Sequence, residues 1–158
     1  MAGAEAAAEV VGRGSIVIIV EGQSDKVALE TLARRRGVDL ASDGVEIIAI
    51  GGAHAIGRFL VALRSERPEV VLRGLCDERE EPRFRRALER AGLGRDLDRG
   101  GLERLGFHVC VADLEDELIR ALGVEGVERV IEAQGELPSL RRLRAQPAQR
   151  GRSSIQHL

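Results

Sequence analysis

Short apolar runs alternate with amphipathic stretches along most of this sequence. The first run, residues 16–20 (IVIIV), is β-branched and contains no polar residue. Runs of this length and composition are typical of strands that are buried on both faces of a sheet. On this pattern we predict four strands, at residues 15–20, 45–50, 70–76 and 107–111.

Apolar residues at helical spacing occupy the segments between the predicted strands. After the first strand, for example, Val27, Leu32 and Ala33 recur at helical spacing before a stop at Gly37. Residues 92–101 (GLGRDLDRGG) lack such a period and are predicted to form a loop. The first predicted helix is capped by Ser24 or Asp25 and runs up to Gly37. The others cover residues 54–64, 82–91, 115–122 and 127–133, with a last helix that begins at Pro138.

Strands and helices that alternate in this way predict an α/β fold in which a parallel four-stranded sheet lies between helices. The 158 residues suffice for one domain with a real core and are too few for two ordinary ones. We place that domain at residues 15–146. Residues 1–14 are expected to form a mobile tail, and residues 147–158 an unstructured or truncated one.

Composition and charge exclude several classes of protein. The net charge of −2 argues against a strongly basic nucleic-acid-binding protein. No apolar segment approaches the length of a membrane span, and the N-terminus lacks the pattern of a signal peptide. Cys76 and Cys110 end apolar runs, which favours buried thiols over a disulfide. We therefore expect a cytoplasmic protein without a membrane partner.

Acidic residues follow three of the four predicted strands, at Glu21, Asp77 and Asp113. Parallel sheets bind their ligands beyond the carboxyl ends of the strands, so we expect these acids at one edge of the sheet. Carboxylate oxygens are the ligands that Mg²⁺ and Mn²⁺ prefer, and a pair of such ions can promote phosphoryl transfer. The sequence therefore predicts a metal site with these three acids as its catalytic ligands.

Some of the neighbouring acids have a purely structural explanation. Acidic side chains favour the first turn of a helix, where they accept hydrogen bonds from free N–H groups and interact well with the helix dipole. Either Ser24 or Asp25 can cap the helix after the first strand, and capping alone explains Asp25 as well as metal binding does. It also explains part of the acidic clusters at residues 77–81 (DEREE) and 113–117 (DLEDE).

The remaining strand ends at Gly51 and Gly52, with His54 close behind. Such a turn can face a phosphate, although a pair of glycines more often forms a plain turn. His54 is predicted to be a polar residue near the start of a helix, with metal binding as the less favoured alternative. These three residues are weak candidates for substrate binding.

Four blocks of this sequence resemble the Toprim domain of OLD-family (overcoming lysogenization defect) nucleases of the stand-alone type. The blocks are VEGQSDKVALETLA, AIGGAHAIGRFL, GLCDEREE and ADLEDELIRALG, within residues 15–150. The resemblance implies a compact Rossmann-like parallel sheet and cleavage of DNA phosphodiesters with two Mg²⁺ or Mn²⁺ ions. By motif, it implies as metal ligands Glu21, Asp25, Asp77, Glu80, Asp113, Glu115 and Glu117.

The sequence departs from this family pattern at two points. The second Asp of the Asp-x-Asp motif is replaced by Arg79, and Glu80 is expected to substitute for it. A late lysine of the family has no counterpart, because Lys26 is the only lysine. We expect that lysine to lie beyond the end of this sequence, with Arg150 or Arg152 as replacements in the alternative case.

These residues predict a metal-dependent phosphodiesterase that nicks DNA by two-metal hydrolysis. One alternative is a catalytically degenerate Toprim module that binds metal and nucleic acid or a partner protein. Another is an RNA-maturing nuclease or a nucleotidyl transferase on the same fold. The sequence lacks the Gly-rich loops that cradle phosphates, so any ATPase would be a separate chain or domain. It is compatible with a homo-oligomer.

Overall fold

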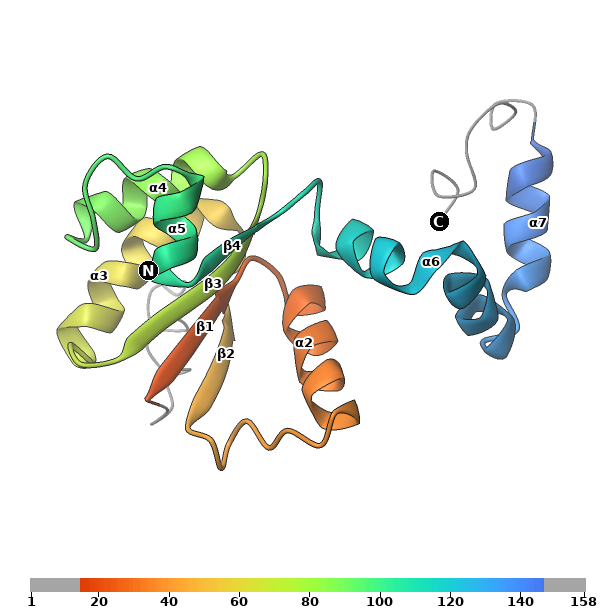
Figure 1. Cartoon of the computed structure of the whole chain (residues 1–158), viewed down its shortest axis with the longest axis horizontal. Helices are drawn as coiled ribbons and strands as arrows, with labels where there is room; N and C mark the ends of the chain where they lie inside the picture. The colour runs from red at the N-terminus through yellow and green to blue at the C-terminus, as the bar shows by residue number, and fades with distance from the viewer. Residues whose placement is uncertain (1–14, 147–158) are drawn as a thin grey trace. The chain divides into compact units, whose positions relative to one another are not determined.

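A computed structural model describes residues 15–146 of the chain, which divides into two compact units, residues 1–110 and 111–158. The first unit contains a four-stranded parallel sheet with the strand order β2-β1-β3-β4 (Figure 1). The predicted α/β fold with a parallel four-stranded sheet is therefore confirmed. Its strands are β1 (Ile16–Val20), β2 (Val45–Ala49), β3 (Val71–Asp77) and β4 (Phe107–Cys110).

Helices lie on both faces of this sheet (Figure 1). Helix α2 (Gln23–Arg35) follows β1 and covers one face. The other face carries α3, α4 and α5, with the short 3₁₀ helix η1 ahead of α3. Their bounds are η1 (Ala53–Ala55), α3 (Ile56–Glu66), α4 (Glu81–Arg90) and α5 (Arg99–Leu105).

The main core lies between the sheet and α3, α4 and α5. Alternate residues of β1, Val17 and Ile19, are fully buried there because successive side chains of a strand point to opposite faces. Phe84 of α4 and Phe107 of β4 meet edge to face, with 6.4 Å between ring centroids. Gly74 of β3 lies directly against the ring of Phe107, and a Cβ atom at this position would come within 2.6 Å of that ring.

The predicted loop at residues 92–101 is wrong in part, because it contains the start of α5. Asp98 caps this helix by accepting a hydrogen bond from the N–H of Gly101 at 2.6 Å. Leu97 and Leu102 are buried in the main core. Capping and burial together stabilise a seven-residue helix that its own glycine-rich sequence would not favour.

The second unit contains two helices, α6 (Leu114–Ala133) and α7 (Leu137–Ala145). The backbone of α6 is interrupted at Gly123, where φ is 71° and ψ is 162°. The predicted break between two helices at this glycine is confirmed. Within residues 15–146, no helix is both long enough and apolar enough to span a membrane.

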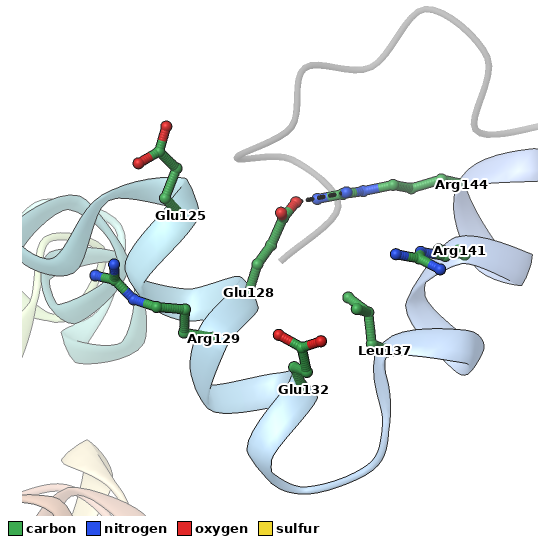
Figure 2. Close-up of a pocket in the computed structure, with 7 residues that line it drawn as sticks. All are labelled: Glu125, Glu128, Arg129, Glu132, Leu137, Arg141 and Arg144. Carbon is green, nitrogen blue, oxygen red and sulfur yellow. Dashed lines mark hydrogen bonds and ion pairs between the residues drawn. The ribbon is translucent and has the colours of Figure 1, made fainter.

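Charged residues dominate the face that α6 and α7 turn toward each other within this second unit (Figure 2). Arg144 of α7 contacts Glu128 of α6 at 2.6 Å, and this ion pair joins the two helices. The surrounding pocket is lined by side chains of both signs: Glu125, Glu128, Arg129, Glu132, Arg141 and Arg144, with Leu137 between them. The lining holds three glutamates and three arginines, so its formal charges cancel.

Candidate metal site at the strand tips

The tips of β1 and β3 meet at the point where the topology of the sheet reverses. From β1 the chain passes through α2 to β2 on one side, and β3 lies on the other side of β1. The segment after β1 leads to one face of the sheet, and the segment after β3 leads to α4 on the opposite face (Figure 1). Such a switch point is where open parallel sheets bind their ligands.

Glu21 and Asp77 lie at this switch point and are joined by a hydrogen bond. Glu21 directly follows β1, and Asp77 is the last residue of β3. The backbone N–H of Asp77 donates to Oε1 of Glu21 at 3.1 Å. This bond holds the Glu21 carboxylate against the backbone of Asp77, the residue at which the turn after β3 begins.

The environment of Glu21 disfavours its negative charge. Burial raises the pKa of the Glu21 carboxyl most, and the negative charges of Asp77, Glu80 and Asp25 raise it further. The hydrogen bond from the N–H of Asp77 acts in the opposite direction and does not outweigh these effects. Four carboxylates that were predicted as ligands therefore share one electrostatic environment, and a cation would relieve their repulsion.

Asp25 has a structural role at the start of α2. Its Oδ2 accepts a hydrogen bond from the N–H of Gly22 at 2.8 Å, which satisfies a backbone donor at the helix N-terminus. Ser24, the other predicted cap, is not the capping residue, because the N-cap position of α2 is occupied by Gly22. The capping explanation for Asp25 therefore holds, and its charge also acts on Glu21.

The turn after β3 is held by arginines from the helices on that face. The N–H of Glu80 donates to the carbonyl of Asp77 at 2.9 Å, which closes the turn. Arg99 of α5 contacts Glu78 at 2.9 Å and Glu81 at 2.7 Å. These ion pairs connect the turn to the unpredicted helix α5. The contribution of Arg99 had no signal in the sequence, because its partners are 18 and 21 residues away.

A second arginine acts on the same turn from α4. Arg83 contacts Glu80 at 3.0 Å, three residues along the chain. This spacing brings two side chains together on one face of a helix turn, so the pair could have been read from the sequence. Glu80, a predicted metal ligand, thus already has a cationic partner, and so does its neighbour Glu81.

The glycine pair lies at the tip of β2, next to the tip of β1. The N–H of Gly52 donates to the carbonyl of Glu21 at 2.8 Å. Gly51 and Gly52 have φ values of 76° and 105°, which only glycine adopts readily. This backbone shape explains both glycines without a ligand. His54 is exposed in η1, beside Gly52. The weak candidates Arg150 and Arg152 lie outside the described residues.

The last group of candidate acids belongs to the second unit, at the start of α6. Asp113 caps this helix by accepting a hydrogen bond from the N–H of Asp116 at 2.8 Å. Oε1 of Glu117 accepts from the N–H of Val111 at 2.9 Å, and this bond lowers the pKa of Glu117, as does the nearby charge of Arg120. Glu115 lies in the first turn of the same helix. Capping thus accounts for much of this cluster.

The carboxylates around Glu21 are chemically suited to a divalent metal, since they are hard oxygen ligands that repel one another. Across residues 15–146, however, no three His, Cys, Asp or Glu side chains are arranged as a ready metal site. The observed partners give a physical reason, because helix N–H groups and arginines engage several of these carboxylates. Metal binding at these acids would require side chains to exchange those partners.

Comparisons with known proteins agree with the predicted resemblance. Residues 15–72 match the family described as overcoming lysogenization defect protein-like, TOPRIM domain. The fold is similar to the C-terminal region of the OLD protein of Xanthomonas campestris pv. campestris, with a TM-score of 0.61, 24% identity and coverage of 88% of this chain and 75% of that one. The C-terminal region of the Burkholderia pseudomallei OLD protein gives a TM-score of 0.62 at 19% identity, covering 91% and 79%. No curated protein sequence matches significantly.

Proposed function

We propose that this chain is a metal-dependent phosphodiesterase module that nicks DNA. Two findings support the proposal: residues 15–72 match the OLD-like TOPRIM domain, and the fold is similar to the C-terminal regions of OLD proteins. The observation that carries the proposal is the hydrogen bond between Asp77 and Glu21 at the switch point of the sheet. It joins the acidic tips of two neighbouring strands in a shared field of negative charge.

In this proposal, Glu21 and Asp77 hold the divalent metal from the strand tips, with Asp25 and Glu80 beside them. For a second ion, the family resemblance implies further ligands from the start of α6: Asp113, Glu115 and Glu117. When bound, Mg²⁺ or Mn²⁺ would neutralise charge on the scissile phosphodiester and make water more acidic. The hydrogen bond to Glu21 orients that carboxylate, and the Arg99 and Arg83 contacts hold the turn that presents Asp77 and Glu80.

A degenerate module that binds metal and nucleic acid without cleavage is the second candidate. Arg79 favours it, since this cation occupies a position in the turn after β3 where the resembled motif has an acid. The two candidates differ in turnover and agree in metal binding. Measurements of both quantities on the same protein therefore distinguish them.

The test is nicking of supercoiled plasmid with Mn²⁺, with Mg²⁺ and with EDTA, together with calorimetry of Mn²⁺ binding. Glu21→Gln is the active-site variant, because it keeps an oxygen that can accept the hydrogen bond from Asp77. Glu69→Gln is its control, since Glu69 is exposed before the start of β3, at the opposite end of that strand. RNA and nucleoside triphosphates serve as alternative substrates, and a C-terminally extended chain is tested in parallel.

Metal-dependent nicking that is lost in Glu21→Gln and kept in Glu69→Gln would support the nuclease. Binding of Mn²⁺ without cleavage, in both the short and the extended chain, would support the degenerate module. If neither chain binds Mn²⁺, or if binding does not depend on Glu21, the proposed site is wrong. Preferential cleavage of RNA would replace DNA as the substrate.

A further inference from the structure

Arg79 is an exposed cation at the corner of the turn between Asp77 and Glu80. The hydrogen bond between these two residues closes the turn over 2.9 Å, so Glu78 and Arg79 occupy its two central positions. We propose that Arg79 is a substrate-binding residue that contacts a backbone phosphate of DNA at the metal site. This inference rests on the proposed function and assigns to the site a phosphate-binding group from its own turn.

The acidic residues around Arg79 form their ion pairs with other arginines. Arg99 contacts Glu78 at 2.9 Å and Glu81 at 2.7 Å, and Arg83 contacts Glu80 at 3.0 Å. The Arg79 side chain itself makes no hydrogen bond or ion pair with another residue of the 15–146 range. Two helices thus supply the cations that balance this turn, and the arginine inside the turn is left facing solvent.

An arginine at this place opposes metal binding unless an anion joins the site. Arg79 follows Asp77 by two residues and directly precedes Glu80 in the chain. Its positive charge would therefore repel a divalent cation held by these two acids. A DNA phosphate reverses the balance, because it attracts both the arginine and the metal. The guanidinium group is suited to this contact, since its planar fork can donate two hydrogen bonds to one phosphate.

This arrangement predicts opposite effects of one substitution on two ligands. Arg79→Gln removes a phosphate contact, so DNA binding should weaken and should depend less on salt. The slope of log K against log salt should fall in magnitude by about 0.9, the value for one phosphate contact on duplex DNA. The same variant should bind Mn²⁺ roughly two- to fivefold more tightly, because one repelling charge is removed from a solvated site. If the substitution merely disturbed the turn, the protein would bind both DNA and Mn²⁺ more weakly.

The experiment measures binding of a labelled DNA duplex and, separately, of a labelled single-stranded RNA in metal-free buffer over a range of salt concentrations. Mn²⁺ calorimetry is done on the same proteins. The variants are Arg79→Gln, the charge-conserving Arg79→Lys, and Arg64→Gln as a control. Arg64 is exposed in the last turn of α3, away from the helix end that follows the β2 tip. The expected result is a lower slope and tighter Mn²⁺ binding in Arg79→Gln alone, with a near-normal slope in Arg79→Lys.

An unchanged slope in Arg79→Gln, with normal binding of DNA and Mn²⁺ by the natural protein, would overturn this inference and leave the proposed function intact. Weaker binding of both DNA and Mn²⁺ by Arg79→Gln would also overturn the inference, because it would indicate a structural role for Arg79. If the natural protein binds neither DNA nor Mn²⁺, the proposed function and this inference are overturned together. A slope change seen only with single-stranded RNA would assign the contact to a different nucleic acid and overturn the inference for DNA.

Discussion

Replacing Gly74 with alanine tests the packing that holds β3 against β4. Gly74 pairs with Phe107 in the parallel register of these strands, three residues before Asp77. A Cβ atom at Gly74 would lie 2.6 Å from two atoms of the Phe107 ring and 3.1 Å from the carbonyl oxygen of Ile19. Carbon atoms in ordinary contact are about 3.5–4.0 Å apart, so the ring would have to move by about 1 Å.

The magnitude follows from two opposing effects. Inserting a methyl group into a well-packed core destabilises by about 1–3 kcal/mol. Replacing glycine with alanine in a strand also restricts the unfolded chain, which favours folding by about 0.5–1 kcal/mol. We expect a net loss of about 1–2 kcal/mol in the free energy of unfolding. Because β3 carries Asp77, metal affinity should also fall if the strand shifts.

Urea unfolding followed by circular dichroism measures this loss, with Gly57→Ala as the matched control. Gly57 is exposed in α3, and a Cβ atom there would meet open space, so this variant should gain about 0.5–1 kcal/mol. In a Phe107→Leu background the ring edge is absent, and Gly74→Ala should destabilise much less. If Gly74→Ala were as stable as the natural protein, or equally harmful in both backgrounds, the close approach to Phe107 would not be its cause.

Three further predictions concern the site and its supports. Glu21→Gln should be more stable than the natural protein at neutral pH in EDTA, because the raised pKa of Glu21 penalises its charged form in the folded state; this advantage in melting temperature should disappear as the pH falls below the ordinary pKa of glutamate. Burial raises the pKa of Cys76 to about 12, and Cys110 is also buried, so both thiols should react slowly with a thiol reagent until the protein is unfolded in urea. Asp98→Ala should destabilise by about 1 kcal/mol in urea unfolding through loss of the α5 cap, and an unchanged stability would contradict the capping role.

The sheet could be predicted from the sequence because its strands are short apolar runs with clear ends. The predicted strand at residues 70–76 is observed at Val71–Asp77, one residue later at each end. The break in α6 was also predictable, because Gly123 adopts a backbone conformation that other residues avoid. In each case a local feature of the sequence, an apolar run or a glycine, is enough to predict where the element lies.

The parts that could not be predicted depend on contacts between distant residues. Helix α5 contains two glycines in seven residues, and its stability comes from burial of Leu102 against the sheet and from its cap. The ion pairs of Arg99 join α5 to a turn about twenty residues earlier. Likewise, the acids at the strand ends were visible in the sequence, but the sequence could not separate metal ligands from helix caps. Asp25 and Asp113 occupy positions that serve both purposes.

The strand order gives a reason to favour Glu21 and Asp77 over the other acids. In the order β2-β1-β3-β4, β1 and β3 are the two central strands, and the chain leaves them toward opposite faces of the sheet. Where the two segments diverge, the N–H of Asp77 takes its partner from a side chain, the carboxylate of Glu21. Asp25 already serves the N-terminus of α2, whereas in the described part of the chain Glu21 caps no helix. A half-buried, charge-repelled carboxylate at a switch point is difficult to explain by stability alone, and a bound cation would supply the missing stabilisation.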